Sequence, residues 1–115
     1  MLSVGIDLVN VNRFNSYSSS SKFILKYFTG KEIKYCFSKS NPSIHLAGKY
    51  AAKEAVFKAL SDFDNFKNKI KMIEILNDSY GVPRVFFDND YEKDFEIKVS
   101  ISHTYQNATA IAILI

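Results

Sequence analysis

The segment Lys49-Tyr50-Ala51-Ala52-Lys53-Glu54-Ala55-Val56-Phe57-Lys58 predicts a helix, because it lacks Gly and Pro and is rich in alanine, the strongest helix former. Glu54 and Lys58 are four positions apart, so they share a face of that helix. The ordinary explanation of this spacing is an exposed ion pair. The alternative is a site for a hard cation and a phosphate, completed by a carboxylate from elsewhere in the chain.

A suitable second carboxylate, Asp7, lies in a stretch near the N-terminus with a period of two, which predicts a strand. Its two alternating sets are Leu2, Val4, Ile6 and Leu8 against Ser3, Gly5, Asp7 and Val9. Asp7 therefore lies on the less apolar face. If the helix packs over this strand, Asp7 and Glu54 can bind an ion such as Mg²⁺, and Lys58 can reach a bridging phosphate.

The remaining patterns predict helices followed by strands, which is typical of an α+β domain with a long helix on an antiparallel sheet. Thr29 and Glu32 have capping-box spacing, and 77–81 has the composition of a hairpin turn. The predicted helices are 22–28, about 30–37 and 44–60, the predicted strands are 70–76, 83–87, 95–103 and 108–115, and the predicted connections are 61–69 and 88–94.

Composition indicates one domain, residues 1–115, with enough apolar residues (47%) to bury a core. The net charge of +3 is too small to indicate nucleic-acid binding and favours an acidic partner. A lone cysteine, Cys36, excludes an intrachain disulfide and suggests a reducing compartment. No signal peptide or bilayer-spanning run is evident, so we expect a cytoplasmic protein with no membrane association.

The segment 108–115 carries no charge, which predicts a strand buried on both faces and, because it ends the chain, a subunit interface. His103 interrupts an apolar alternation in 95–103. Such a histidine is more often a packed core group than one that faces a ligand at a strand end. The two histidines and Cys36 do not have zinc-site spacing, and the glycine-rich phosphate loops and the Gly-x-Ser-x-Gly motif are absent.

The sequence resembles the holo-acyl-carrier-protein synthases, the short bacterial family of 4′-phosphopantetheinyl transferases. The resemblance covers nearly the whole chain in family order. Its most specific parts are the strand with Asp7 and the Ala-Ala-Lys-Glu-Ala helix. The matching segments are Gly5-Ile6-Asp7-Leu8-Val9, Arg13-Phe14, Thr29-Gly30-Lys31-Glu32, Leu46-Ala47-Gly48-Lys49-Tyr50-Ala51-Ala52-Lys53-Glu54-Ala55, Lys58-Ala59, Tyr80-Gly81-Val82-Pro83 and Val99-Ser100-Ile101-Ser102-His103-Thr104.

The resemblance implies a 4′-phosphopantetheinyl transferase fold and a Mg²⁺-dependent enzyme of fatty acid biosynthesis. This reaction moves the phosphopantetheine arm of coenzyme A onto a serine of apo-acyl carrier protein and releases adenosine 3′,5′-bisphosphate. Asp7 and Glu54 match the metal ligands of the family, and Lys58 matches its helix lysine. Glu54, directly or through a metal-bound water, is the candidate base. The matching coenzyme A contacts are Lys49, Lys58, Pro83, His103 and Thr104.

The resemblance also implies a homotrimer with sites between neighbouring subunits and a basic surface for an acidic carrier protein. Arg13 matches that surface, and Lys22 and Lys26 are further candidates, although a solvated helix face explains them equally well. The sequence departs from the family after the long helix, where Leu60-Ser61-Asp62-Phe63 replaces a glycine turn. Asp62 and Asp64 bring negative charge there, and Lys67 and Lys69 could compensate.

Two other functions stay open from sequence alone. The altered loop could mark a catalytically impaired module that binds carrier proteins on the same scaffold. A small RNA-binding domain is permitted by the charge and the aromatic content, but no aromatic-rich strand motif or basic stripe supports it.

Overall fold

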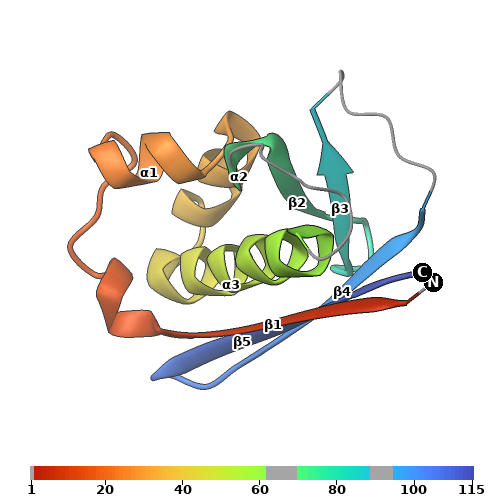
Figure 1. Ribbon diagram of the computed structural model, residues 1–115. Helices are drawn as coiled ribbons and strands as arrows, with labels where there is room; N and C mark the ends of the chain where they lie inside the picture. The colour runs from red at the N-terminus through yellow and green to blue at the C-terminus, as the bar shows by residue number, and fades with distance from the viewer. Residues whose placement is uncertain (1, 62–69, 89–94) are drawn as a thin grey trace.

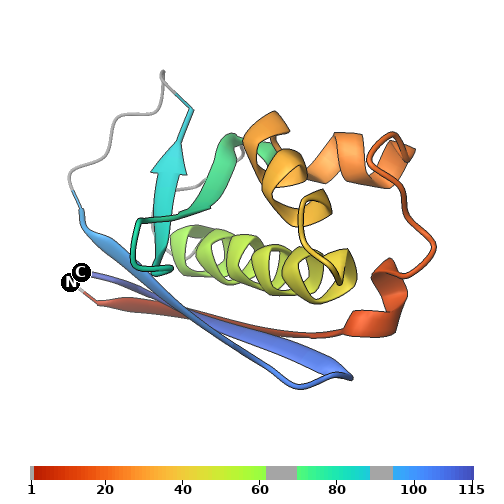
Figure 2. The ribbon, with the colours of Figure 1, turned by 180° about the vertical axis from the view of Figure 1, so that it is seen from behind.

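The computed structural model describes residues 2–61, 70–88 and 95–115. A long central helix is covered on one side by a sheet and on the other by short helices and a hairpin (Figures 1 and 2). The elements are β1 (Ser3–Asn10), the 3₁₀ turn η1 (Val11–Phe14), α1 (Lys22–Tyr27), α2 (Gly30–Phe37), α3 (Pro42–Ser61), the 3₁₀ turn η2 (Ile70–Met72), β2 (Ile73–Asn77), β3 (Pro83–Phe87), β4 (Ile97–His103) and β5 (Asn107–Leu114).

The predicted α+β class, with a long helix on an antiparallel sheet, is confirmed. The strand order in the larger sheet is β1-β5-β4, and every pairing is antiparallel. β2 and β3 form a separate two-stranded hairpin, as predicted. Its turn is closed by Gly81, whose φ of 82° suits glycine, and by Asp78, whose carboxylate accepts hydrogen bonds from the backbone N–H groups of Tyr80 and Val82.

The predicted helices are also present. Thr29 and Glu32 form both hydrogen bonds of the capping box at the start of α2. The long helix begins at Pro42, earlier than predicted, because proline suits the first helical position, where no N–H partner is needed. Residues 70–72 were predicted as strand and instead form η2 before β2. Of the predicted connections 61–69 and 88–94, Ser61 instead ends α3, Asp88 follows β3, and the rest lies outside the described residues, as do Asp62, Asp64, Lys67 and Lys69.

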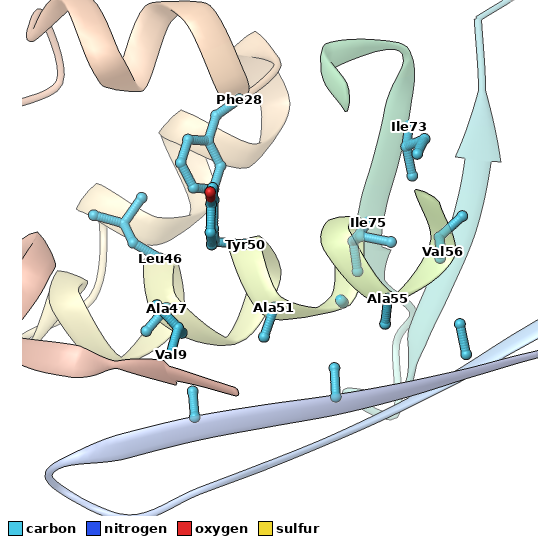
Figure 3. Packing of buried hydrophobic residues seen from close by; sticks show 14 of the residues in the cluster. Val9, Phe28, Leu46, Ala47, Tyr50, Ala51, Ala55, Val56, Ile73 and Ile75 are labelled. Atoms are coloured by element: carbon cyan, nitrogen blue, oxygen red, sulfur yellow. The ribbon is translucent and has the colours of Figure 1, made fainter. Parts of the chain in front are cut away.

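α3 is buried on nearly all sides, which explains why it shows little amphipathic pattern. Its side toward the sheet carries the small residues Ala47, Ala51 and Ala55 (Figure 3). Strand β1 crosses this side so closely that a Cβ built at Gly5 would lie 1.9 Å from the backbone oxygen of Ala55. Small residues are therefore required where β1 crosses α3.

The sheet buries the less apolar face of β1 against α3. Leu2, Val4, Ile6 and Leu8 lie on the outer face and are 61–73% exposed. The prediction that β5 is buried on both faces is wrong within one chain, because none of the described residues covers that outer face. There Ile111 and Ile113 stay exposed and pair in register with Ile6 and Val4. The result is a continuous apolar surface, which we call the outer sheet face: Leu2, Val4, Ile6, Leu8, Ile111, Ile113 and Ile115.

Candidate functional site

Asp7 lies on the inner face of β1, two residues beyond the point where Gly5 touches α3. Its carboxylate lies 3.3 Å from Lys58 Nζ, which also donates a 3.0 Å hydrogen bond to the backbone oxygen of Ile6. Thr109 on β5 donates to the backbone oxygen of Asp7 and fixes the strand from the other side. The side chains of Asp7 and Lys58 are 18% and 52% exposed, so solvent or a ligand can reach both.

Glu54 is half-buried on α3, one turn before Lys58. The ion pair of Lys58 is formed with Asp7, so the explanation of Glu54 and Lys58 as a simple helix-surface pair is wrong. The contact of Lys58 with Asp7 places these two residues at the seam between β1 and α3, and helical spacing puts Glu54 one turn before Lys58 on the same face of α3. We call these three residues the acidic site.

Tyr50 lies one turn before Glu54 on the same side of α3. Burial raises the pKa of the Tyr50 hydroxyl, and the charge of Glu54 and a hydrogen bond with Glu54 raise it further. Arg13 acts in the opposite direction through a hydrogen bond and its own charge. Its guanidinium carbon lies 4.9 Å from the centre of the Tyr50 ring, within cation–π range.

A separate cleft of about 250 Å³ lies between the N-terminal half of α3, the β2–β3 turn and the end of β4. Three of the predicted coenzyme A contacts line it: Lys49, Pro83 and His103. Thr104 lines the adjoining cleft with His103, and its hydroxyl accepts hydrogen bonds from the backbone N–H groups of Gln106 and Asn107. His103 is exposed at the strand end, so the core interpretation of this residue is wrong.

Lys49 is only 4% exposed and contributes to the floor of this cleft. Its amino group donates 2.7 Å hydrogen bonds to the backbone oxygen of Ile75 and to Asn77 Oδ1, and it lies 4.5 Å from the centre of the Tyr35 ring. Burial lowers its pKa. Its predicted role as a ligand contact therefore competes with a structural role that joins α3 to β2.

The structure does not bring all the predicted residues together in one chain. Lys49 and Lys58 are nine positions apart, about two and a half helical turns, so they point to opposite sides of α3. The acidic site faces β1, whereas the cleft with Lys49, Pro83 and His103 faces the hairpin and β4. Within one chain the predicted residues therefore form two separate groups.

The predicted carrier-binding residues follow the acidic site along the chain. Arg13 lies in η1 directly after β1, and its side chain is exposed on one side and packed on Tyr50 and Phe23 on the other. Lys22 and Lys26 are exposed on α1. Within the parts of the chain that the structure describes, no helix is both long and apolar enough to cross a membrane.

The sequence profile described as the 4′-phosphopantetheinyl transferase superfamily matches residues 3–114. A holo-[acyl-carrier-protein] synthase of Clostridium tetani is 42% identical, with 99% of this chain and 95% of the relative covered. The chain belongs to the holo-acyl-carrier-protein synthase family.

Solved structures of this family have the same fold. The Helicobacter pylori holo-[acyl-carrier-protein] synthase in complex with coenzyme A has a TM-score of 0.78 and 27% identity, and 97% of this chain and 99% of that chain are covered. The Mycobacterium tuberculosis acyl carrier protein synthase has a TM-score of 0.75 and 35% identity, with 98% and 96% covered.

Sequence reasoning missed His45 and a buried ion pair of this synthase fold. His45 lines the cleft beside His103, and burial lowers its pKa, with smaller effects from Lys39, His103 and Lys49. The sequence signal for the place of His45 in the cleft was its position one helical turn before Lys49.

The missed ion pair joins Lys53 to Glu32 at 2.7 Å, and both side chains are fully buried. Glu32 also accepts hydrogen bonds from the backbone N–H groups of Thr29 and Ile75, so it ties α2, α3 and β2 together. A lysine directly after Ala51-Ala52 on a buried helix was the available signal, since a buried lysine requires a partner.

Proposed function

We propose that this chain is a holo-acyl-carrier-protein synthase that transfers the 4′-phosphopantetheine group of coenzyme A to a serine hydroxyl of an apo-acyl carrier protein. The observation that carries this conclusion is the full-length match to the family. The reaction forms a bond from the serine oxygen to the phosphorus that bears pantetheine. It breaks the bond from that phosphorus to the leaving adenosine 3′,5′-bisphosphate.

Asp7 and Glu54 are the proposed ligands of Mg²⁺. Within the described residues no three His, Cys, Asp or Glu side chains gather as a complete metal cage. Two carboxylates with open sides suit Mg²⁺, which is usually held by one or two carboxylates with waters and substrate phosphates. When bound, the ion would supply positive charge against the pyrophosphate.

The residues of the acidic site have separate proposed roles in binding the phosphate and accepting the serine proton. Lys58 is anchored on the backbone of β1 and half exposed, so it can direct its charge to the phosphate. Glu54 is the proposed acceptor of the serine proton, directly or through a water. Arg13, Lys22 and Lys26 form the proposed basic surface for the acidic carrier protein, and the exposed positions of all three support this.

Lys49, Pro83, His103 and Thr104 are the proposed second half of the coenzyme A site. Because they lie on the opposite side of α3 from Lys58, we propose that each complete site combines the acidic site of one subunit with the cleft of a neighbour. The outer sheet face supports an oligomer, since a contiguous exposed apolar surface of this kind typically marks an interface. The proposed assembly is a homotrimer.

The function is tested by incubating the protein with apo-carrier, coenzyme A and Mg²⁺ and then weighing the carrier by mass spectrometry. A gain of the phosphopantetheine mass is expected. Asp7→Asn and Glu54→Gln should abolish the gain while keeping the circular dichroism spectrum. Glu96→Gln is the matched control, because Glu96 is an exposed acid paired with Lys98. A carrier that gains no mass with the unaltered protein would overturn the assignment.

The shared site is tested by subunit complementation. Asp7→Asn and His103→Ala each damage a different half-site, so a refolded mixture should regain about a quarter of the wild-type sites. Sedimentation should give a trimer. A monomer, or a mixture that stays as inactive as its components, would contradict the shared site. No feature of the described residues favours the impaired binding module. Of its altered segment, Leu60-Ser61-Asp62-Phe63, Leu60 and Ser61 end α3 and the rest lies outside the described residues.

A further inference from the structure

The ring of Tyr50 is held in an aromatic cluster between α3, η1 and α1. Phe14, Phe23, Tyr27 and Phe28 surround it, with ring centres 5.6–6.4 Å away. Figure 3 shows Tyr50 rising from α3 toward Phe28. Only 8% of the residue is exposed. The position of the hydroxyl is therefore set by packing before any substrate arrives.

The hydroxyl lies at the beginning of a polar row that leads into the acidic site. Tyr50, Glu54 and Lys58 follow each other at intervals of four residues, so each is one turn beyond the last. Glu54 raises the pKa of the Tyr50 hydroxyl and Arg13 lowers it, so both side chains act on this hydroxyl, and the Arg13 guanidinium carbon lies 4.9 Å from the centre of the Tyr50 ring. At the far end Lys58 contacts Asp7. A row of neighbouring polar side chains on α3 thus leads from Arg13, on the proposed carrier surface, past Glu54 to the Lys58–Asp7 pair.

We propose that Tyr50 and Arg13 are positioning residues for Glu54: the Tyr50 hydroxyl orients the Glu54 carboxylate, and Arg13 fixes that hydroxyl while it also contacts the carrier protein. This inference rests on the proposed function and adds to it a link between the carrier surface and the acidic site.

Glu54 needs such support more than Asp7 does. The backbone of Asp7 is fixed by the sheet and by Thr109, and its carboxylate is paired with Lys58. Glu54 has a longer side chain with more rotamers on a helix surface, so an unsupported carboxylate would lose more conformational freedom on binding. Partners that orient a metal-ligating carboxylate typically affect metal affinity or activity 10- to 100-fold.

Arg13 is suited to connect the two functions because its guanidinium has several donors and two faces. One face stacks on the Tyr50 and Phe23 rings, at 4.9 and 5.2 Å from their centres. The exposed side is free to meet an acidic carrier residue, and holding Arg13 there would also hold the Tyr50 hydroxyl. If Tyr50 had only a structural role, its ring would be sufficient and its hydroxyl would not be needed.

The decisive variant is Tyr50→Phe, which keeps the ring in the aromatic cluster and removes only the hydroxyl. Tyr27→Phe is the matched control, because Tyr27 belongs to the same cluster but is not part of the polar row. Calorimetric titration of each variant with Mg²⁺, in the presence of coenzyme A, measures metal affinity without turnover. Steady-state kinetics measure kcat and the KM for coenzyme A, and urea unfolding measures stability.

For Tyr50→Phe we expect Mg²⁺ affinity and kcat to fall about tenfold, while the KM for coenzyme A and the urea midpoint change little. Tyr27→Phe should match the unaltered protein in all four measurements. If Tyr50→Phe binds Mg²⁺ as tightly as the unaltered protein, or if Tyr27→Phe loses affinity equally, the proposal is wrong. An unaltered protein that binds Mg²⁺ but does not modify the carrier would instead overturn the proposed function.

Arg13→Gln tests the link to the carrier surface, with Lys22→Gln as its control. Arg13→Gln should raise the KM for the carrier and also weaken Mg²⁺ binding severalfold when no carrier is present. Lys22→Gln should raise the KM for the carrier and leave Mg²⁺ affinity as it was. An Arg13→Gln variant with an altered carrier KM and normal Mg²⁺ affinity would show that Arg13 acts only in docking.

Discussion

Gly5→Ala tests the dependence of the acidic site on the close crossing of β1 over α3. The added Cβ would lie 1.9 Å from the backbone oxygen of Ala55 and 2.9 Å from the backbone nitrogen of Ala59. Real Cβ contacts are essentially never shorter than 3.0 Å, so strand and helix must separate by about 1.1 Å. Backbone atoms cannot turn away as a side chain does, so β1 itself must shift.

Asp7 follows Gly5 by two residues on the same face of β1, so the shift moves its carboxylate away from Glu54. A misplacement of about 1 Å can cost about 100-fold in rate. Overpacking of this kind typically costs about 1–3 kcal/mol of stability. We therefore expect kcat to fall about 100-fold in the carrier-modification assay. Urea unfolding should show a loss of about 1–3 kcal/mol.

Two other glycines provide graded controls. A Cβ at Gly30 meets no atom of residues 2–61, 70–88 or 95–115 within 4 Å, so Gly30→Ala should leave activity and stability unchanged or slightly raise stability. At Gly48 the close atom among the described residues is a side-chain methyl of Ile101 at 3.2 Å, which can move, so Gly48→Ala should have a small effect. If Gly5→Ala behaves like Gly30→Ala, the argument from close packing fails.

Three further predictions concern buried and titratable groups. Lys53→Met leaves Glu32 as a buried carboxylate without its cation and should cost about 3–5 kcal/mol in urea unfolding; a loss below about 1 kcal/mol would contradict the buried pair. Burial raises the pKa of Cys36 to about 12, so a thiol reagent at pH 8 should label it only at the rate of unfolding, and rapid labelling of the native protein would refute its burial. Burial and Lys39 lower the pKa of His45 below its usual 6.5, so the unfolded chain binds this proton more tightly and stability should decline as pH falls below about 6.5. His45→Gln should decline less over the same range in thermal unfolding, and an equal decline would exclude His45 as a source.

Most helices and strands could be predicted because short runs of neighbouring residues determine them. The period of two in β1, the capping box of Thr29 and Glu32, and the hairpin turn each need only a few neighbouring residues. The orientation of β1 could not be predicted in the same way. The more apolar set of β1 residues points outward and forms part of the outer sheet face. The less apolar set faces α3, because the close crossing at Gly5 requires small residues there.

The sequence named the candidate residues but could not predict how they are arranged. Asp7 and Lys58 do meet, yet Lys49 lies on the far side of α3, and helical geometry could have indicated this from their spacing. The pairing of Lys53 with Glu32 and the cluster around Tyr50 depend on how α1 and α2 pack onto α3. Such contacts between distant segments carry no signal in a single sequence.

The alanines of α3 have a consequence for how sequences of this fold can diverge. Ala47, Ala51 and Ala55 are fully buried on the side of α3 toward the sheet, so a bulkier substitution there would need a compensating change in a strand. We expect this stretch to vary slowly even at positions that never touch a substrate. Much of what makes the segment recognisable would then reflect limited space rather than chemistry, and a chain could keep this signature after its activity was gone.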